Sequence, residues 1–183
     1  GMPTKFQVAA VLHVLHGIAQ GDQYILGALG GAFNSRLNIN LREDKGWTYG
    51  ARSGFSGDKI TGDFEFSSGI RANATDSAMI EIIKELKSYA ENGITEEELS
   101  FMKSAIGQRD ALRYETGFQK AGFIGNILEN NLPADYVDQQ NKIVAGMSKA
   151  EIDALAKKWI DASKMNILVV GDKEKILPTL QKL

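Results

Sequence analysis

The sequence predicts an α+β domain in which an antiparallel-rich sheet packs against helices in two layers. The predicted elements follow the order strand, helix, hairpin, a run of helices and a last strand. Strands and helices do not alternate regularly, which argues against a parallel βαβ sheet. The chain of 183 residues has the usual size of one domain, and no linker or low-complexity tract divides it. We therefore expect residues 1–183 to form a single domain.

Four stretches have the composition of strands. Residues 6–16 are rich in Val and Leu, which predicts a mostly buried strand. Residues 47–56 and 60–70 flank a short glycine-containing turn, and the second stretch alternates apolar and polar side chains. Together they predict a hairpin. Residues 165–170 are apolar except for Asn166 and predict a buried strand near the end of the chain.

The first predicted helix lies between Asp22 and Leu41, where apolar residues recur at every fourth position. The Gly30-Gly31 pair interrupts this row. Because each glycine costs about 1 kcal/mol relative to alanine inside a helix, the pair predicts a break or a close approach of the backbone to a neighbour.

The later helices are bounded by capping signals. Thr75 is the predicted N-cap of a helix that ends at Asn92-Gly93. Thr95 and Ser148 are each followed three residues later by a glutamate, which is the pattern of a capping box. Residues 117–147 predict further helix around a proline-containing interruption.

Composition excludes several classes of protein. The chain has no cysteine, so disulfides, thiolate nucleophiles and thiolate metal sites are excluded, and the compartment stays open. A net charge of −2 argues against a dedicated nucleic-acid surface. No apolar run is long enough for a membrane span, and no signal-type pattern follows the first residues. Gly1 before Met2 is typical of a cloning scar, so we expect a domain excised from a longer protein.

A zinc site within the chain is not predicted. The histidines are His13 and His16, and on a strand residues three apart point to opposite faces. A catalytic zinc needs about three protein ligands, and no His-x-x-Glu-His or His-Glu-x-x-His pattern is present. A structural role near a strand end is the favoured interpretation of both histidines.

Residues 29–50, L-G-G-A-F-N-S-R-L-N-I-N-L-R-E-D-K-G-W-T-Y-G, are dense in polar residues for a helix that ends in a strand. Arg42 closes the helical row, where a cation suits the helix dipole, and Gly46 allows the turn toward Tyr49. A guanidinium and a phenol at one edge would suit the carbonyls or carboxylates of a peptide. In the alternative interpretation, Arg42 pairs with Glu43 or Asp44 in solvent and Tyr49 is a sheet aromatic.

This segment resembles the signature of the non-catalytic, C-terminal-half domain of the pitrilysin, insulin-degrading enzyme and mitochondrial processing peptidase family of zinc metallopeptidases. The shared pattern is Leu-Gly-Gly-x-Phe-x-Ser-Arg-Leu, then Leu-Arg-Glu, Lys-Gly and x-x-Tyr-Gly. The hairpin, the Gly-Ile-Thr-Glu-Glu-Glu-Leu junction at 93–99 and Val-Val-Gly-Asp at 169–172 extend the resemblance along the chain.

The resemblance implies a role for Arg42 and Tyr49, which keep the seven-residue spacing of the family's Arg and Tyr. In that family the Arg and the Tyr contact the substrate backbone and help to stabilise the tetrahedral intermediate, and such stabilisation is often a large contribution to catalysis. The resemblance also implies that zinc and its general base lie in a homologous partner domain or subunit, with no cofactor in this segment. A homo- or heterodimer and an exported location, as for bacterial relatives, are further implications.

Other residues of the segment have two interpretations each. Gly30 and Gly31 permit close approach of the backbone to a peptide or close helix packing. Asn34, Ser35 and Arg36 line the chamber or, more commonly, cap and solvate the helix. The predicted hairpin could accept an extended substrate by edge pairing, and which edge is free stays open. Trp47 and Phe55 are expected in the core.

The sequence thus predicts the substrate-clamping, non-metal half of a zinc endopeptidase that cleaves peptides in an enclosed chamber, inactive as an isolated domain. In this mechanism zinc-bound water of the partner attacks a carbonyl whose oxygen Tyr49 also contacts, while Arg42 holds neighbouring substrate groups. One alternative is a catalytically inactive structural or partner-binding homologue of that family. Another is an unrelated hydrolase with a convergent site, which would cleave substrate without zinc.

Overall fold

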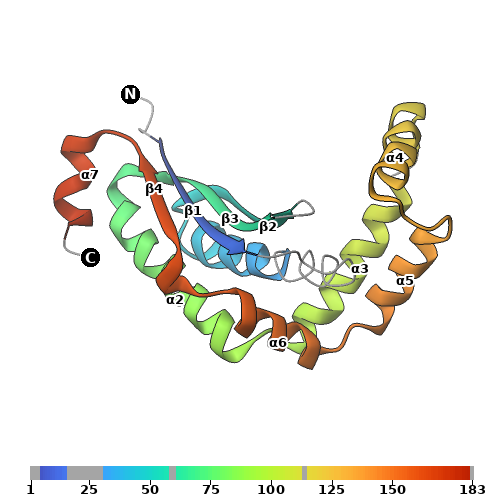
Figure 1. The fold of residues 1–183 in the computed structure, drawn as a ribbon. Coiled ribbons are helices and arrows are strands. Elements are labelled where there is room, and N and C mark those ends of the chain that lie inside the picture. Colours follow the sequence, from blue (N-terminus) through green and yellow to red (C-terminus); the bar gives the residue numbers. More distant parts are fainter. Residues whose placement is uncertain (1–4, 16–30, 58–60, 113–114, 182–183) are drawn as a thin grey trace.

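The computed structural model describes residues 5–15, 31–57, 61–112 and 115–181, with side chains described for 31–55, 62–106 and 115–181. A sheet of four strands forms one layer, in the order β2-β3-β1-β4. Its members are β1 (Lys5–Leu15), β2 (Thr48–Gly57), β3 (Thr61–Arg71) and β4 (Asn166–Val170). Every neighbouring pair is antiparallel. The predicted α+β class and hairpin are therefore confirmed (Figure 1).

Helices form the second layer. A helical segment over residues 31–37 continues into the π-helix η1 (Asn38–Asp44). The short 3-10 turn η2 (Ala72–Ala74) leads into α2 (Thr75–Asn92), which lies along the sheet in Figure 1. Phe33 of the first helix packs against Phe64 of β3 and Tyr89 of α2, with ring centroids 5.7 and 5.5 Å apart. These contacts join both layers in one core, where burial raises the pKa of Tyr89.

The alternation predicted for the hairpin is visible in β3. Phe64, Phe66 and Ile70 are fully buried against the helices. Glu65, between them, is exposed. One face of the hairpin therefore carries the core, and the other is left uncovered by the helices. Trp47 and Phe55 are partly buried against the core, as expected.

Three helices extend away from the sheet, and they are α3 (Glu96–Leu112), α4 (Gly117–Asn130) and α5 (Tyr136–Gly146). The next helix, α6 (Lys149–Trp159), returns and packs against α2, with Ile152 and Ala156 in the core. The predicted capping box at Thr95 is confirmed by Glu98 N donating to Thr95 Oγ1 (3.1 Å) and Thr95 N donating to Glu98 Oε2 (2.7 Å). The capping box at Ser148 is confirmed as well. None of the helices in the described part of the chain is long and apolar enough to cross a membrane.

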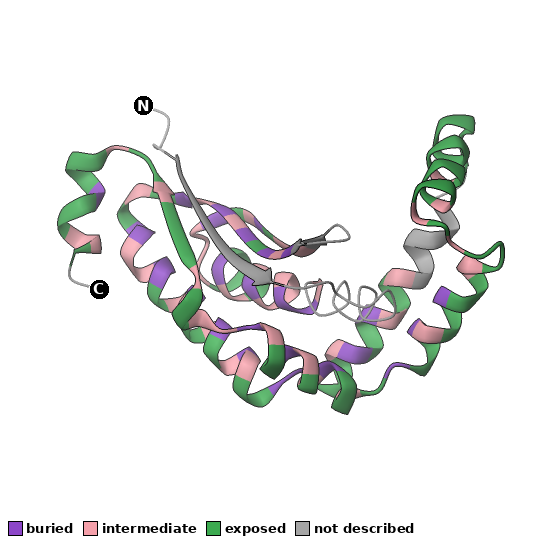
Figure 2. Ribbon diagram, viewed as in Figure 1, coloured by how far each residue is buried: buried purple, intermediate pink, exposed green. Residues whose placement is uncertain are grey.

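Helix α4 stands at the end of this extension, and its side chains remain accessible (Figure 2). It has no buried residue, and Phe118 is 90% exposed. Caps stabilise both ends of the helix. Thr116 forms a capping box with Gln119, and Asn131 adopts the left-handed conformation at the C-cap.

Two sequence predictions, one about a helix cap and one about the burial of a strand, are wrong. Thr75 is not an N-cap, because the preceding turn η2 already places Ala74 at that position, without a side-chain cap. The Thr75 hydroxyl lies within the helix and donates back to Ala72 O (3.1 Å). The last strand, β4, is not buried, because it pairs with β1 at the sheet edge, and Leu168 is 62% exposed.

Two elements near the C-terminus were not predicted from the sequence. They are the 3-10 turn η3 (Ala162–Lys164) and the helix α7 (Lys173–Leu180). Asp172 caps α7 through a hydrogen bond from Glu174 N (3.2 Å). Ile176 is the buried residue of this short helix, so its apolar pattern is too brief to stand out in the sequence.

Arg36 joins the first helix to the junction between α2 and α3. Its guanidinium makes a two-pronged ion pair with Glu98, donates from Nη2 to Gly93 O (2.7 Å), and lies 4.8 Å from the centre of the Tyr89 ring. The hydrogen bond to Glu98 is the main cause of a raised pKa of Arg36. Arg36 is therefore a structural anchor rather than a free chamber-wall residue.

Replacing Arg36 with methionine is expected to lower the free energy of unfolding by about 2 kcal/mol. The half-buried Glu98 would lose its charged partner, and the Gly93 carbonyl would lose its side-chain donor. Equilibrium urea denaturation followed by circular dichroism measures the change. The matched control, Arg71→Met, removes an exposed arginine and is expected to stay within about 0.5 kcal/mol of the parent. Equal stabilities of the two variants would contradict the anchor role.

Candidate functional site

The segment between Arg42 and Tyr49 folds as a tight turn from helix to strand. Helix η1 ends at Asp44, and Gly46 adopts φ 61°, a left-handed conformation that favours glycine. Gly46 N donates to Arg42 O (3.1 Å), and Trp47 N donates to Leu41 O (2.8 Å). These bonds close the turn, so the seven-residue spacing spans one helix end and the first residues of β2.

Polar contacts hold this turn against α2. Lys45 Nζ donates to Asn40 Oδ1 (2.6 Å) and lies 3.6 Å from Glu81 Oε2. Asn40 Nδ2 in turn donates to Glu81 Oε2 (3.1 Å) and Glu85 Oε1 (2.8 Å). The hydrogen bond from Asn40, helped by the charge of Lys45, lowers the pKa of Glu81. The polar residues of the motif are thus largely used to position the turn.

Arg42 and Tyr49 are both presented at the surface. The Arg42 side chain is 56% exposed, and its Nε lies 3.4 Å from Glu43 Oε1. Tyr49 is 76% exposed. The Arg42–Glu43 pair is the contact that the alternative interpretation named, and exposed pairs of this kind hold their partners weakly. The guanidinium can therefore exchange Glu43 for a peptide group at little cost.

A β-bulge sets the direction of Tyr49. Thr48 pairs with Ile70 and Ala51 pairs with Ser68, so Tyr49 and Gly50 together oppose a single residue of β3. Bulges of this kind bend a strand and re-aim a side chain. Tyr49 lies within this bulge, so the bulge sets the direction of its side chain.

Two buried hydroxyls stabilise the bulge. Thr48 Oγ1 lies 2.9 Å from Ser68 Oγ and accepts from Gly50 N (3.0 Å), and it lies within hydrogen-bond distance of the carbonyl oxygens of Gly50 and Gly69. Ser68 Oγ also reaches Gly50 O (3.0 Å). Both residues are buried, so these contacts replace strand hydrogen bonds lost at the bulge.

Replacing Thr48 with valine is expected to lower the free energy of unfolding by about 2 kcal/mol, because the isosteric change removes the hydroxyl and leaves Gly50 N and Ser68 Oγ without it. Thermal or urea denaturation of Thr48→Val, Ser68→Ala and the double variant measures this. The two effects should be strongly non-additive. Full additivity would show that the hydroxyls act separately and would contradict this account of the bulge.

The outer edge of β2 is covered at this point by Asn38. Its Nδ2 donates to Ala51 O (2.9 Å), and its Oδ1 accepts from Ala51 N (2.9 Å). The amide takes the place of a neighbouring strand. An extended peptide cannot pair with β2 at Ala51 unless Asn38 moves. At this residue, therefore, the outer edge of the hairpin is not free.

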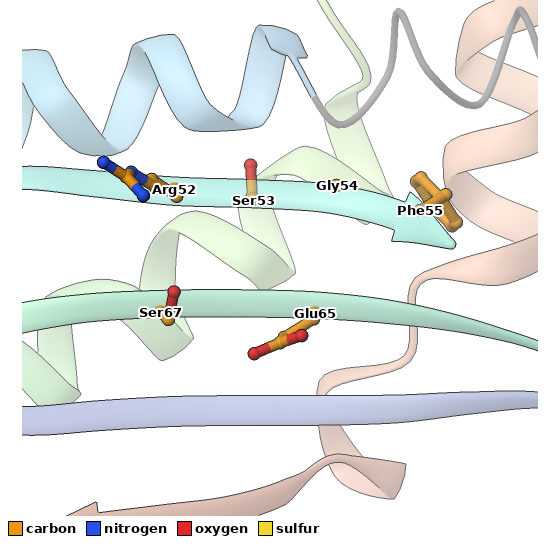
Figure 3. Close-up of a pocket in the computed structure, with 6 residues that line it drawn as sticks. All are labelled: Arg52, Ser53, Gly54, Phe55, Glu65 and Ser67. Carbon is orange, nitrogen blue, oxygen red and sulfur yellow. The ribbon is translucent and has the colours of Figure 1, made fainter. Parts of the chain in front are cut away.

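Two shallow depressions lie on the uncovered side of the hairpin. The first has a volume of 340 Å³ and borders Tyr49, Arg52, Ser67 and Gly69 among its lining residues. The second, of 230 Å³, is formed by residues from β2 and β3 and includes Glu65 (Figure 3). Arg52 and Ser67 line both depressions, so the two are neighbours on the hairpin.

The side chains that the structure describes do not form a zinc site. No group of three or more His, Cys, Asp or Glu side chains that could hold a metal ion occurs within the described residues. His13 lies on β1 in register with Asp63 of β3, and His16 lies outside the described residues.

Of the glycine pair, for which a break or a close approach was predicted, Gly31 is described and Gly30 lies outside the described residues. Gly31 is helical, and an added Cβ would lie 3.0 Å from Met102 Cε. It allows close packing against α3. The same helix places Asn34 O within 2.8 Å of Asn38 Nδ2, so Asn34 serves the helix itself.

Several residues of this site were missed by sequence reasoning. Asn38, Thr48, Ser68 and Arg52 act through partners 13 to 20 positions away along the chain. Arg52 also carries no motif of its own. An alternation count over residues 47–56 could have assigned Arg52 to the exposed face, but the bulge shifts that count by one residue.

Comparison with known proteins places the chain in a family. The sequence model described as the peptidase M16 inactive domain matches residues 16–106. Among curated proteins, the non-peptidase homologue YmxG of Helicobacter pylori is 28% identical over 159 residues, covering 84% of this chain and 36% of that protein.

Solved structures share the fold. The peptidase M16 inactive domain from Pseudomonas fluorescens has a TM-score of 0.77 at 23% identity, covering 92% of this chain and 41% of that one. The inactive peptidase domain of a protein described as a zinc protease, from Bordetella parapertussis, has a TM-score of 0.76 at 15% identity, covering 94% and 93%. The periplasmic protease PqqL from Escherichia coli has a TM-score of 0.76 at 16% identity, covering 94% and 20%.

The chain spans well under half the length of YmxG and of the Pseudomonas chain, but nearly all of the Bordetella domain. The family match covers the helix-turn-strand motif, the hairpin and the first long helices. The resemblance found in residues 29–50 is thereby confirmed, and through residues 16–106 the chain belongs to the inactive, C-terminal-half domains of the M16 zinc peptidases.

Proposed function

We propose that this chain is the substrate-clamping, zinc-free half of a zinc endopeptidase. The observation that carries the proposal is the presentation of Tyr49 on a hydroxyl-stabilised bulge, exposed and bordering a depression, with Arg42 at the helix end of the same turn. An exposed tyrosine held on a rigid element is suited to contact a ligand. The reaction class, peptide hydrolysis, is inferred from the peptidase family to which the chain belongs.

The chemistry follows from the two side chains. The phenol of Tyr49 is one directed donor and would donate to the carbonyl oxygen of the scissile peptide as negative charge develops there. The guanidinium of Arg42 is permanently charged and would hold neighbouring carbonyl or carboxylate groups of the substrate. Zinc, in the partner, supplies the activation of water.

The partner is a homologous, zinc-bearing domain in the same chain or in another subunit, and a homo- or heterodimer would also bring the two halves together. Support comes from the lengths of the relatives, of which this chain covers 36% and 41%. The similarity to a periplasmic protease supports an exported location.

A second function is favoured by a specific observation. The relative YmxG is described as a non-peptidase homologue, and Arg42 is paired with Glu43 in the structure. In this alternative the chain is a catalytically inactive homologue that binds a partner or contributes only structure.

Zinc content and cleavage of a mixed library of unstructured peptides distinguish these functions. The measurement is made on this chain alone and again after addition of its zinc-bearing half. The proposed function predicts less than stoichiometric zinc and no cleavage for the chain alone, with cleavage on addition of the other half. Zinc-independent cleavage by the chain alone would overturn it. No cleavage in the presence of every partner would favour the inactive homologue.

A further inference from the structure

We propose that the depression beside Tyr49 is a binding subsite for an acidic side chain of a peptide, with Arg52 as the ligand for its carboxylate. The inference deepens the proposed function and rests on it for the nature of the ligand. It concerns a residue outside the family motif of residues 29–50. The geometry of Arg52 on the hairpin carries the argument.

Arg52 is held on the uncovered face of the hairpin. It pairs with Ser67 of β3 immediately after the bulge, and it is exposed. Figure 3 shows Arg52 and Ser67 at the same end of the second depression, on neighbouring strands. Since the two residues line both depressions, Arg52 lies between them.

The charge of Arg52 is not neutralised by the side chains that the structure describes around it. Glu65 pairs with Gly54 and not with Arg52, so the two charges are in diagonal positions on the strands. Among the side chains that the structure describes, no carboxylate lies within ion-pair distance of Arg52. The guanidinium retains its donors for a ligand.

The two depressions differ in charge, and this difference selects the ligand. The described lining of the first contains one cation, Arg52, together with the hydroxyls of Tyr49 and Ser67, and it contains no carboxylate. Glu65 lines only the second depression. An acidic side chain is therefore favoured next to Tyr49, whereas Glu65 disfavours it beside Phe55.

The expected strength is that of one partly solvated, charge-assisted contact. An arginine fork that holds a carboxylate gives about a tenfold preference over the neutral amide of the same shape. Because the site is open to solvent, the preference should shrink as ionic strength rises. The volume of 340 Å³ accommodates a side chain and the adjoining backbone.

The test measures binding of three fluorescein-labelled unstructured peptides to this chain by anisotropy. The peptides are identical except for a central Asp, Asn or Lys. The variants are Arg52→Gln and Glu65→Gln, with Lys120→Gln on α4 as a matched loss of one exposed positive charge far from the hairpin. Circular dichroism checks that each variant is folded.

The parent chain should bind the Asp peptide about tenfold more tightly than the Asn peptide. Arg52→Gln should remove this preference, and Lys120→Gln and Glu65→Gln should retain it. Equal binding of the Asp and Asn peptides by the parent chain, a preference that survives Arg52→Gln, or no binding of any peptide at about millimolar concentration would overturn the subsite.

This outcome is separable from that of the proposed function. Binding to the chain alone requires no zinc and no cleavage, so an acid preference lost in Arg52→Gln supports the subsite even if Tyr49→Phe leaves cleavage unchanged in the assembled protein. Conversely, loss of cleavage in Tyr49→Phe with no acid preference supports the clamp and rejects the subsite.

Discussion

Replacing Gly93 with alanine is expected to lower the free energy of unfolding by about 4 kcal/mol or to prevent folding. Gly93 adopts φ 70° and ψ −150°, a region that is essentially restricted to glycine. An added Cβ would lie 1.8 Å from Asp153 Oδ1. That oxygen accepts a hydrogen bond from Ile94 N (2.9 Å) and cannot retreat without breaking it. Asp153 is also held by an ion pair with Lys149.

The matched control is Gly122→Ala on α4, where an added Cβ meets nothing within 4 Å. Removing a glycine from an exposed helix should be neutral or stabilising by about 1 kcal/mol. Guanidinium denaturation followed by circular dichroism measures both variants. If Gly93→Ala were within about 1 kcal/mol of the parent, the close contact between the α2–α3 junction and α6 would be wrong.

Local signals in the sequence are sufficient for most of the fold. The capping boxes at Thr95 and Ser148 and the stop at Gly93 lie where they were predicted, because each depends on residues within a few positions of one another. The hairpin alternation is similarly local. The helix-to-strand turn around Gly46 follows from the same kind of signal.

The wrong predictions, the N-cap at Thr75 and the burial of β4, arise where a neighbouring element alters the structure that a local pattern predicts. Thr75 has the right chemistry for an N-cap, but η2 supplies a helical turn before it, so its hydroxyl binds backward. The apolar strand β4 is exposed because its place at the sheet edge is set by pairing with β1, more than 150 residues earlier. Neither the turn before Thr75 nor the edge position of β4 can be predicted from the residues of the segment alone.

The candidate site is predictable only in part for the same reason. The motif points to Arg42 and Tyr49 through the family resemblance, and both are at the surface. The groups that aim Tyr49 could not be found, because Thr48 meets Ser68 across the hairpin and Asn38 reaches Ala51 from another element. These contacts depend on the register of β2 with β3, which a bulge alters.

Replacing Tyr49 with phenylalanine in the assembled, zinc-containing protein is expected to lower kcat by about a hundredfold. The change removes only the phenolic hydroxyl, whose donation to the developing oxyanion is realised in the transition state, so KM should change little. Arg42→Ala should instead raise KM, because the guanidinium holds groups of the substrate before and during the reaction. Arg42→Lys should recover part of the loss, since it restores the charge without the fork.

The most direct test of the clamp role is the rate of peptide cleavage at saturating substrate, measured for the assembled parent protein, Tyr49→Phe and Tyr136→Phe. Tyr136 lies on α5, away from the hairpin, and its variant removes the same hydroxyl. The clamp role predicts a loss of about a hundredfold for Tyr49→Phe and a rate within about twofold of the parent for Tyr136→Phe. A parent-like rate for Tyr49→Phe would contradict it.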